Sequence, residues 1–414
     1  MLRTAIDLKE AIDNVEANVN PIGTCPLDIL SWKQEHGGYY EENQDQGDSS
    51  DNLGNITQSD INDIISGLKT KYYSESRIKG HIHINYENFD YDGDLDIPQD
   101  KLKDLFTIAP DAPYGDNRTL ETKIDKEVRD AKDISLDHFT IDPSVIQQIS
   151  DLWSRNLYPK NVIVKPYKIN LYGKNGHFDR HKDTPDKDMV GTGLIALTES
   201  SSALTIHSVD LEDKYRWIPR GGDCIVFYTD CEHQVNRVWN NDIRATLAFK
   251  IYSDEENSVK EEDVQNDQIN QVSNTLEKLN LKNVGFLLGH GYSLQTEAFK
   301  GKDHLLVKVL TKMGKQFKVI PIIHKWYVNS WHSGCSEEDD ISSNVYPFTE
   351  EHIDAILNNH DLPSDNNDII KFYSINGSDY VWKDERQEYI EYTGNESLPE
   401  EQNSIYLSRA LIFQ

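Results

Sequence analysis

Two histidines and one aspartate, divided between two segments, have the types and spacing of a metal site. His181 and Asp183 stand in the segment HKD. Residues i and i+2 of a strand point to the same side, so one imidazole and one carboxylate can reach a single ion. His233 follows the apolar run CIVFY and the turn-like TDCE about fifty residues later. Two histidines and one carboxylate leave an iron(II) ion three open positions, which suits oxygen chemistry.

A competing pair precedes this one. His177 and Asp179 form a second HxD four residues earlier, with the same strand parity. Spacing inside the motif does not choose between His181 and His177. Taken alone, a histidine at the end of a strand is more often a surface or capping residue than a ligand.

An arginine opens a strand-like segment eleven residues after His233. Alternation in RATLAFKIY places Arg244, Thr246 and Ala248 on one face, as in a barrel strand that faces a pocket. A guanidinium offers a carboxylate two parallel hydrogen bonds. We therefore expect Arg244 to bind the distal carboxylate of 2-oxoglutarate, whose other end takes two positions on the metal. Arg237, four residues after His233, is the alternative anchor.

Short β-rich runs fill the chain from about residue 80 to residue 253 and position these residues. Examples are HIHINY, NVIVKPYKINLYG, TGLIALT, CIVFYTD and IRATLAFKIYS, with turns such as GKNG and RGGD between them. This pattern predicts a sandwich or barrel, with helices such as 143–155 packed outside.

The flanking regions have a different character. Residues 8–18 are expected to be helical, and the polar, acidic residues 41–61 are expected to be a loop or disordered insertion. The charged stretch 253–268 reads as a linker that runs into a helix. Beyond it, helical segments at 304–313 and 350–358 alternate with strand-like ones, such as FKVIPIIHKWYV, which predicts a second α+β unit.

Charge and cysteine content restrict the setting. The 414 residues carry a formal net charge of -29, which argues against binding to nucleic acid or to an anionic membrane surface and favours basic partners. Four scattered cysteines suggest neither a disulfide framework nor a zinc ribbon. The N-terminus lacks the apolar core of a signal peptide, and no run is long enough to span a membrane. We expect a cytoplasmic protein, or a nuclear one.

The segment around the candidate ligands resembles the catalytic domain of iron(II)/2-oxoglutarate oxygenases of the prolyl 4-hydroxylase class. Those enzymes read approximately Y-G-x-x-G, H-x-D-T, D-C-x-H and then Arg or Lys about ten residues on. The matches are Tyr172-Gly173 with Gly176, His181 to Thr184, Asp230 to His233, and Arg244. The family's tyrosine lies nine residues before its first ligand, as Tyr172 does before His181, and this favours His181 over His177. The interval from His233 to Arg244 is slightly long for the family.

The resemblance implies a double-stranded β-helix (jelly roll) with supporting helices at residues 70–254, in a chain that is α+β and mainly β. Residues 1–69 would precede it, 255–280 would form a linker and helix, and 281–414 a C-terminal α+β domain. Segments 112–131, 284–303 and 392–413 resemble uncharacterised fungal and bacterial members, so the likeness covers most of the chain.

The implied activity is hydroxylation of a C–H bond, with release of succinate and CO2. Iron(II) would bind His181, Asp183 and His233, while Arg244 and Tyr172 would hold 2-oxoglutarate. O2 is the oxidant and ascorbate is expected as the reductant. A peptidyl proline is the expected substrate, although relatives oxidise other side chains and small molecules. Two alternatives stay open, a non-catalytic jelly-roll binding module and a cupin-like metalloenzyme that does not use 2-oxoglutarate.

Overall fold

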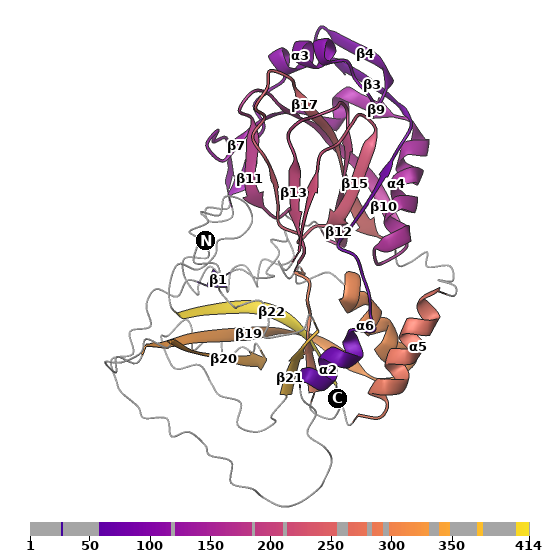
Figure 1. Cartoon of the computed structure of the whole chain (residues 1–414), viewed down its shortest axis with the longest axis vertical. Coiled ribbons are helices and arrows are strands. Elements are labelled where there is room, and N and C mark those ends of the chain that lie inside the picture. Colours follow the sequence, from indigo (N-terminus) through magenta and orange to yellow (C-terminus); the bar gives the residue numbers. More distant parts are fainter. Residues whose placement is uncertain are drawn as a thin grey trace, which may run out of the picture.

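The computed structural model describes residues 26–27, 58–116, 121–183, 187–209, 213–254, 264–279, 284–292, 298–330, 339–347, 371–375 and 403–413. They form a β-rich unit, at the top of Figure 1, and a second unit below it with one sheet and three helices. The expected combination of a mainly β unit with an α+β unit is confirmed.

Two antiparallel sheets build the β-rich unit as a double-stranded β-helix. The larger sheet has the order β2-β15-β12-β17-β10-β8 and the smaller one the order β14-β13-β16-β11-β7. The strands of the larger sheet are β2 (Tyr73–Arg77), β8 (Lys132–Ser135), β10 (Val162–Tyr172), β12 (Met189–Ala196), β15 (Asp223–Tyr228) and β17 (Arg244–Ser253). Those of the smaller sheet are β7 (Arg129–Asp130), β11 (His177–His181), β13 (Leu204–His207), β14 (Lys214–Trp217) and β16 (His233–Val235).

Smaller elements surround the two sheets. Three strands form a separate sheet in the order β4-β3-β9, and β5 pairs with β6. These elements are β3 (His81–Tyr86), β4 (Phe89–Asp94), β5 (Tyr114–Asp116), β6 (Glu121–Lys123), β9 (Phe139–Ile141), α3 (Gln99–Ile108) and the 3-10 helix η2 (Leu136–His138).

Helix α4 (Pro143–Asn156) covers the outer face of the larger sheet, as the sequence predicted for 143–155. Asp142 caps it by accepting a hydrogen bond from the backbone N–H of Ser144, and proline at the first turn is pre-organised for a helix. The buried Trp153 comes so close to β12 that a Cβ on Gly191 would lie 2.1 Å from its ring. Only glycine lets this helix and this strand pack together.

The second unit contains a sheet of the order β20-β19-β22-β18-β21, with β1 paired to β22. All its pairings are antiparallel except that of β18 with β21. Its elements are β1 (Pro26–Leu27), α2 (Gln58–Ile65), α5 (Val264–Leu276), β18 (Val284–Leu287), α6 (Gly301–Lys312), β19 (Phe317–Ser330), β20 (Asp339–Pro347), β21 (Lys371–Ser374) and β22 (Asn403–Phe413).

Helix α2 corrects one expectation. Residues 58–61 were predicted to end a loop or disordered insertion, but they begin a helix. Ile61 and Ile65, one helical turn apart, are buried with Val272 of α5 and Leu306 of α6 in the core of the second unit. Burial of these two isoleucines on one face stabilises a helix, although the surrounding sequence is polar. Residues 41–57 and the helices expected at 8–18 and 350–358 lie outside the described residues.

No helix in the described part of the chain is both long enough and apolar enough to cross a lipid bilayer.

A buried polar network joins the two units next to strand β16. The ammonium of Lys300 donates to Asp230 Oδ1 (2.8 Å) and to the carbonyl of Gly291 (2.8 Å). The backbone N–H of Gly291 donates to Asp230 Oδ2 (2.7 Å), which also lies 3.0 Å from His290 Nδ1. Although burial alone raises it, Lys300 and His290 hold the pKa of Asp230 well below its usual range. Residues of the second unit therefore bind the carboxylate of Asp230, three residues before His233.

Replacing Lys300 with methionine is expected to destabilise the protein by about 3 kcal/mol, because it leaves the carboxylate of Asp230 buried with less compensation. Chemical denaturation of the full chain measures the change. The matched control is Lys302→Met, in the first turn of α6. Equal unfolding midpoints for wild type and Lys300→Met would contradict this role of the ion pair.

Candidate active site

Strands β11 and β16 bring the two candidate histidines together. They pair antiparallel with His181 opposite His233, after an irregularity in register that follows Phe178. Asp183 lies two residues beyond the end of β11, and its Oδ1 is 3.9 Å from His233 Nε2. One ligand atom from each of the three residues lies within 4.8 Å of the others. Among the described residues, no other group of three histidine, cysteine, aspartate or glutamate side chains converges in this way.

The histidine rings are held in an orientation that suits a metal. Nδ1 of His181 donates to the carbonyl of Asp179 (2.7 Å), and Nδ1 of His233 donates to the carbonyl of Cys231 (3.0 Å). With the proton on Nδ1, each Nε2 keeps its lone pair for a cation. Burial, followed by the nearby His233, lowers the pKa of His181 well below its usual value. The ring is therefore neutral at neutral pH, as metal binding requires.

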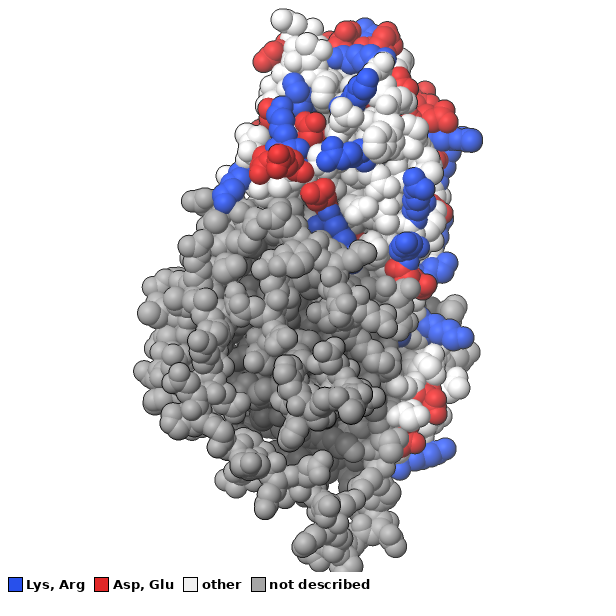
Figure 2. All heavy atoms as spheres, turned by 60° about the vertical axis from the view of Figure 1, so that its left-hand side comes forward, with Lys and Arg blue, Asp and Glu red and all other residues white. Residues whose placement is uncertain are grey.

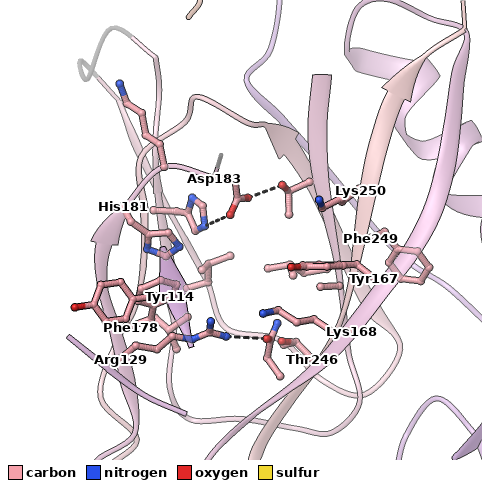
Figure 3. Close-up of a pocket in the computed structure, with 18 of the residues that line it drawn as sticks. Tyr114, Arg129, Tyr167, Lys168, Phe178, His181, Asp183, Thr246, Phe249 and Lys250 are labelled. Carbon is pink, nitrogen blue, oxygen red and sulfur yellow. Dashed lines mark hydrogen bonds and ion pairs between the residues drawn. The ribbon is translucent and has the colours of Figure 1, made fainter. Parts of the chain in front are cut away.

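Thr192 supports the carboxylate. Its hydroxyl donates to Asp183 Oδ2 at 2.5 Å, which leaves Oδ1 directed toward the histidines (Figure 3). Thr192 lies on β12, where every residue is buried. Thr192 was not singled out from the sequence. The available signal was a lone hydroxyl in the otherwise apolar segment MVGTGLIA.

Replacing Thr192 with valine is expected to weaken binding of a divalent metal by roughly 10- to 100-fold, the usual cost of losing a hydrogen bond that orients a ligand. The two side chains have nearly the same shape, so the fold should be retained. Calorimetric titration of iron(II) without oxygen measures the affinity. Thr205→Val, on β13, is the control. An affinity within twofold of wild type would show that the hydroxyl does not orient Asp183.

The competing pair lies elsewhere. The ring of His177 contacts the carbonyls of Glu127 (Nε2, 2.8 Å) and Asn175 (Nδ1, 3.2 Å). The side chain of Asp179 is half exposed and lies 3.7 Å from His177 Nε2. His177 is thus engaged by backbone oxygens and does not belong to the converging group.

Arg244 is fully buried at the start of β17. Its three guanidinium nitrogens have no hydrogen-bond partner among the described residues. Tyr172 is its direct partner across the β10–β17 pairing, and the ring of Trp217 lies 5.9 Å from Cζ. Burial lowers the pKa of Arg244 to about 10, so the side chain remains a cation at neutral pH. A buried, unpartnered guanidinium is unfavourable unless an anion binds to it.

The alternative anchor has different surroundings. Arg237 is exposed, and its Nη2 lies 3.4 Å from His177 Nε2. It is not among the residues that line the cavity at the triad.

A cavity of about 310 Å³ between the two sheets connects these groups. His181, Asp183 and His233 line it together with Tyr172 and Arg244. The face predicted for β17 is confirmed, because Arg244, Thr246 and Ala248 all line the cavity. Its apolar walls include Leu194, Leu204, Val235 and Phe249. A volume of this size suits a small ligand.

Three polar residues of the wall, Arg129, Lys168 and Asn170, were not singled out from the sequence. Lys168 and Asn170 alternate with apolar residues in KINLY, which marks a pocket-facing strand face. Arg129 stands alone in a short polar segment, where no pattern indicates its position.

Residues 167–252 match the family model of the 2OG-Fe(II) oxygenase superfamily. These residues include Tyr172, the converging triad and Arg244. The resemblance to this superfamily is therefore confirmed over the segment that builds the cavity. No curated protein matches the chain.

Solved structures of three such oxygenases align with part of the chain. A prolyl-4-hydroxylase from Pseudomonas putida is 16% identical, with 47% of this chain and 99% of that one covered and a TM-score of 0.30. A 2OG-Fe(II) oxygenase family oxidoreductase from Burkholderia pseudomallei is 15% identical, with 37% and 77% covered and a TM-score of 0.26. A prolyl hydroxylase from Trichoplax adhaerens, in complex with a hypoxia inducible factor peptide, is 12% identical, with 49% and 94% covered and a TM-score of 0.31. At these TM-scores the likeness adds nothing to the family model.

Proposed function

We propose that this protein is an iron(II)- and 2-oxoglutarate-dependent dioxygenase that hydroxylates a C–H bond of its substrate. His181, Asp183 and His233 would hold the iron, and Arg244 with Tyr172 would hold 2-oxoglutarate. The observation that carries the proposal is the buried guanidinium of Arg244, which has no partner among the described residues and opens into the same cavity as the triad.

The donor set suits iron(II). Two neutral imidazoles and one carboxylate leave three positions open, two for the chelating end of 2-oxoglutarate and one for O2. Each histidine keeps its orientation through its Nδ1–H, and Asp183 through the hydroxyl of Thr192. With both outer contacts made by backbone carbonyls, the imidazoles stay neutral ligands. A site for zinc alone would not need the unpartnered cation of Arg244 beside it.

The surroundings of Arg244 suit a carboxylate. A guanidinium binds a carboxylate through two parallel hydrogen bonds, which are strong where water is excluded. Tyr172 lies opposite Arg244 in the strand pairing and lines the same cavity, so its hydroxyl is available to the same ligand. Apolar side chains such as Leu204 and Val235 line the same cavity as this anchor and the triad.

Iron with 2-oxoglutarate supplies the oxidative chemistry, in which O2 gives one oxygen atom to succinate and one to the substrate, with release of CO2. Arg244 and Tyr172 would hold the distal carboxylate of the co-substrate, and His181, Asp183 and His233 would hold the iron that binds its other end. Ascorbate would serve as the reductant that restores iron(II).

A prolyl residue in a peptide is the substrate we propose for this site. The support is the resemblance of the Tyr172 to Arg244 segment to the prolyl 4-hydroxylase class, together with a cavity large enough for a side chain beside the co-substrate. A non-catalytic binding module would have no use for a buried cation beside three convergent ligands. A cupin-like enzyme without 2-oxoglutarate would leave Arg244 uncompensated.

Succinate release tests the proposal. The full chain with iron(II), 2-oxoglutarate, ascorbate and O2 is expected to form succinate slowly even without substrate, and faster with a proline-containing peptide digest of a proteome. The same chain loaded with zinc(II), which has no redox chemistry, is the control. Equal succinate in both samples would refute the proposal.

A further inference from the structure

The cavity contains more positive charge than the iron site and the co-substrate anchor use. Its lining includes five cationic side chains and a single carboxylate, that of Asp183. Arg244 is assigned to 2-oxoglutarate, which leaves Arg129, Lys168, Lys182 and Lys250. Basic and acidic side chains are mixed on the visible outer surface of the jelly-roll unit (Figure 2). The lining of this cavity is thus strongly positive in a chain whose net charge is -29.

Arg129 is the most deeply placed of these four, with 5% of its surface exposed. Its guanidinium donates to two neutral oxygens, the carbonyl of Pro113 (2.5 Å) and Oδ1 of Asn170 (3.0 Å). Its Nε has no partner among the described residues. Neither of these two oxygens carries a charge, so the hydrogen bonds orient the guanidinium of Arg129 without neutralising it.

A second cation faces Arg129. Figure 3 shows the ammonium of Lys168 pointing toward the guanidinium of Arg129 across the lower part of the cavity. Burial, followed by the charge of Arg129, lowers the pKa of Lys168, while its ion pair with Asp133 (2.9 Å) opposes this effect. Two partly buried cations that face each other repel, and an anion between them would make the interaction of each with its surroundings favourable.

The pair lies close to the metal ligands. The Arg129 guanidinium lies 4.7 Å from the centre of the Phe178 ring, and that ring stacks on His181 at 3.5 Å between centroids. On the other side, Lys168 and Lys250 both lie over the ring of Tyr167, at 5.1 Å and 4.7 Å. Tyr167 is 44% exposed, so this group extends from the surface into the cavity.

We propose that Arg129 and Lys168, with Lys250 at the entrance, bind an anionic group of the substrate, a carboxylate, and so place the neighbouring C–H bond beside the triad. The inference rests on the proposed function and names the substrate class for that site. It opposes the expectation from net charge, because the cavity selects acidic ligands although the chain is acidic. The carboxylate can belong to a free organic acid or to an acidic side chain next to the target residue in a peptide.

Paired probes that differ in one charge test the proposal. The full chain is loaded with manganese(II) and 2-oxoglutarate and titrated by calorimetry. One arm compares N-acetylproline with N-acetylprolinamide, and the other compares acetyl-Pro-Asp-amide with acetyl-Pro-Asn-amide. In at least one arm the acidic probe is expected to bind about tenfold more tightly than its amide, and the arm that shows this identifies the source.

Arg129→Gln is expected to reduce this preference to less than about threefold, whereas Arg155→Gln, an exposed arginine on α4, should keep it. If Arg129→Gln does not fold, as judged by circular dichroism, Lys250→Gln replaces it. The preference of this variant for the acidic probe is expected to be about threefold lower than that of wild type. Equal binding of acid and amide by wild type, no binding of either acidic probe, or a preference retained in the variant would overturn the proposal.

Separate titration of 2-oxoglutarate distinguishes the two sites. If Arg129→Gln weakens the affinity for 2-oxoglutarate by the same factor as the affinity for the acidic probe, Arg129 belongs to the co-substrate site and the inference fails. The succinate assay decides the proposed function independently, because the probe titrations do not require turnover. If wild type releases succinate but binds the acidic probes no more tightly than their amides, the inference fails and the proposed function stands.

Discussion

Replacing His181 with alanine is expected to abolish iron binding and to reduce succinate release to the rate of free iron in solution. His181 provides one of three convergent ligand atoms, and its ring is already neutral and oriented by the carbonyl of Asp179. The loss of affinity should exceed the roughly 10- to 100-fold that the loss of an outer hydrogen-bond partner costs. Calorimetric titration of iron(II) without oxygen, followed by a succinate assay, measures both effects.

His177 offers a matched control on the same strand. It is buried to a similar degree, but its ring contacts backbone carbonyls and lies outside the triad. His177→Ala should bind iron(II) with an affinity within about twofold of wild type, because it removes no ligand. If the two variants lost iron equally, the assignment of the metal to His181 would be wrong.

Replacing Arg244 with methionine is expected to weaken 2-oxoglutarate binding at least roughly 30-fold and to leave iron binding intact. Loss of one partner of a buried, hydrogen-bonded charge pair costs about 2 kcal/mol or more, which corresponds to that factor. In wild type, 2-oxoglutarate at 100 times its Kd should stabilise the fold by about 2.7 kcal/mol, and at the same concentration the stabilisation of the variant should fall to about 0.9 kcal/mol or less.

Two comparisons make this experiment specific. The variant without ligand should be no less stable than wild type, because methionine removes a buried cation that has no partner among the described residues. Lost binding would then not reflect unfolding. Arg237→Met removes an exposed arginine from outside the cavity lining and should retain 2-oxoglutarate affinity. The reverse result, with Arg237 essential and Arg244 dispensable, would move the anchor to Arg237.

The sequence predicted those features that local patterns determine. The apolar alternation of 162–172 and 244–253 indicated strands β10 and β17, and their parity predicted that Arg244 and Thr246 share a face. The prediction for β17 succeeded because strand geometry has a period of two, which can be read from neighbouring residues. The parity of His181 and Asp183 also suggested one ion, but Asp183 lies two residues beyond the end of β11, where the hydroxyl of Thr192 holds its carboxylate.

Features that depend on long-range packing could not be predicted. Helix α2 looked like the end of a polar insertion, since the partners of Ile61 and Ile65 lie some two hundred residues away in α5 and α6. Arg129 is separated by forty-one residues from Asn170, to which it donates a hydrogen bond. Asp230 and Lys300 meet only because the second unit folds against the barrel. The choice between His181 and His177 came from family resemblance and had no basis in spacing alone.

The ion pair of Asp230 with Lys300 gives the second unit a role at the site. Asp230 lies between Tyr228 at the end of β15 and His233 at the start of β16, so this contact fixes the turn that delivers the third ligand. The Lys300→Met variant therefore also reports whether the iron site depends on the second unit.

We propose above all that His181, Asp183 and His233 support oxidation that is coupled to 2-oxoglutarate. Incubation of the full chain with iron(II), 2-oxoglutarate, ascorbate and oxygen-18 gas tests it most directly, with mass spectrometry of the succinate formed. Wild type is predicted to produce succinate that carries one atom of oxygen-18, and His181→Ala is predicted to produce none above the level of free iron. Unlabelled succinate, or equal labelling by wild type and His181→Ala, would contradict the account.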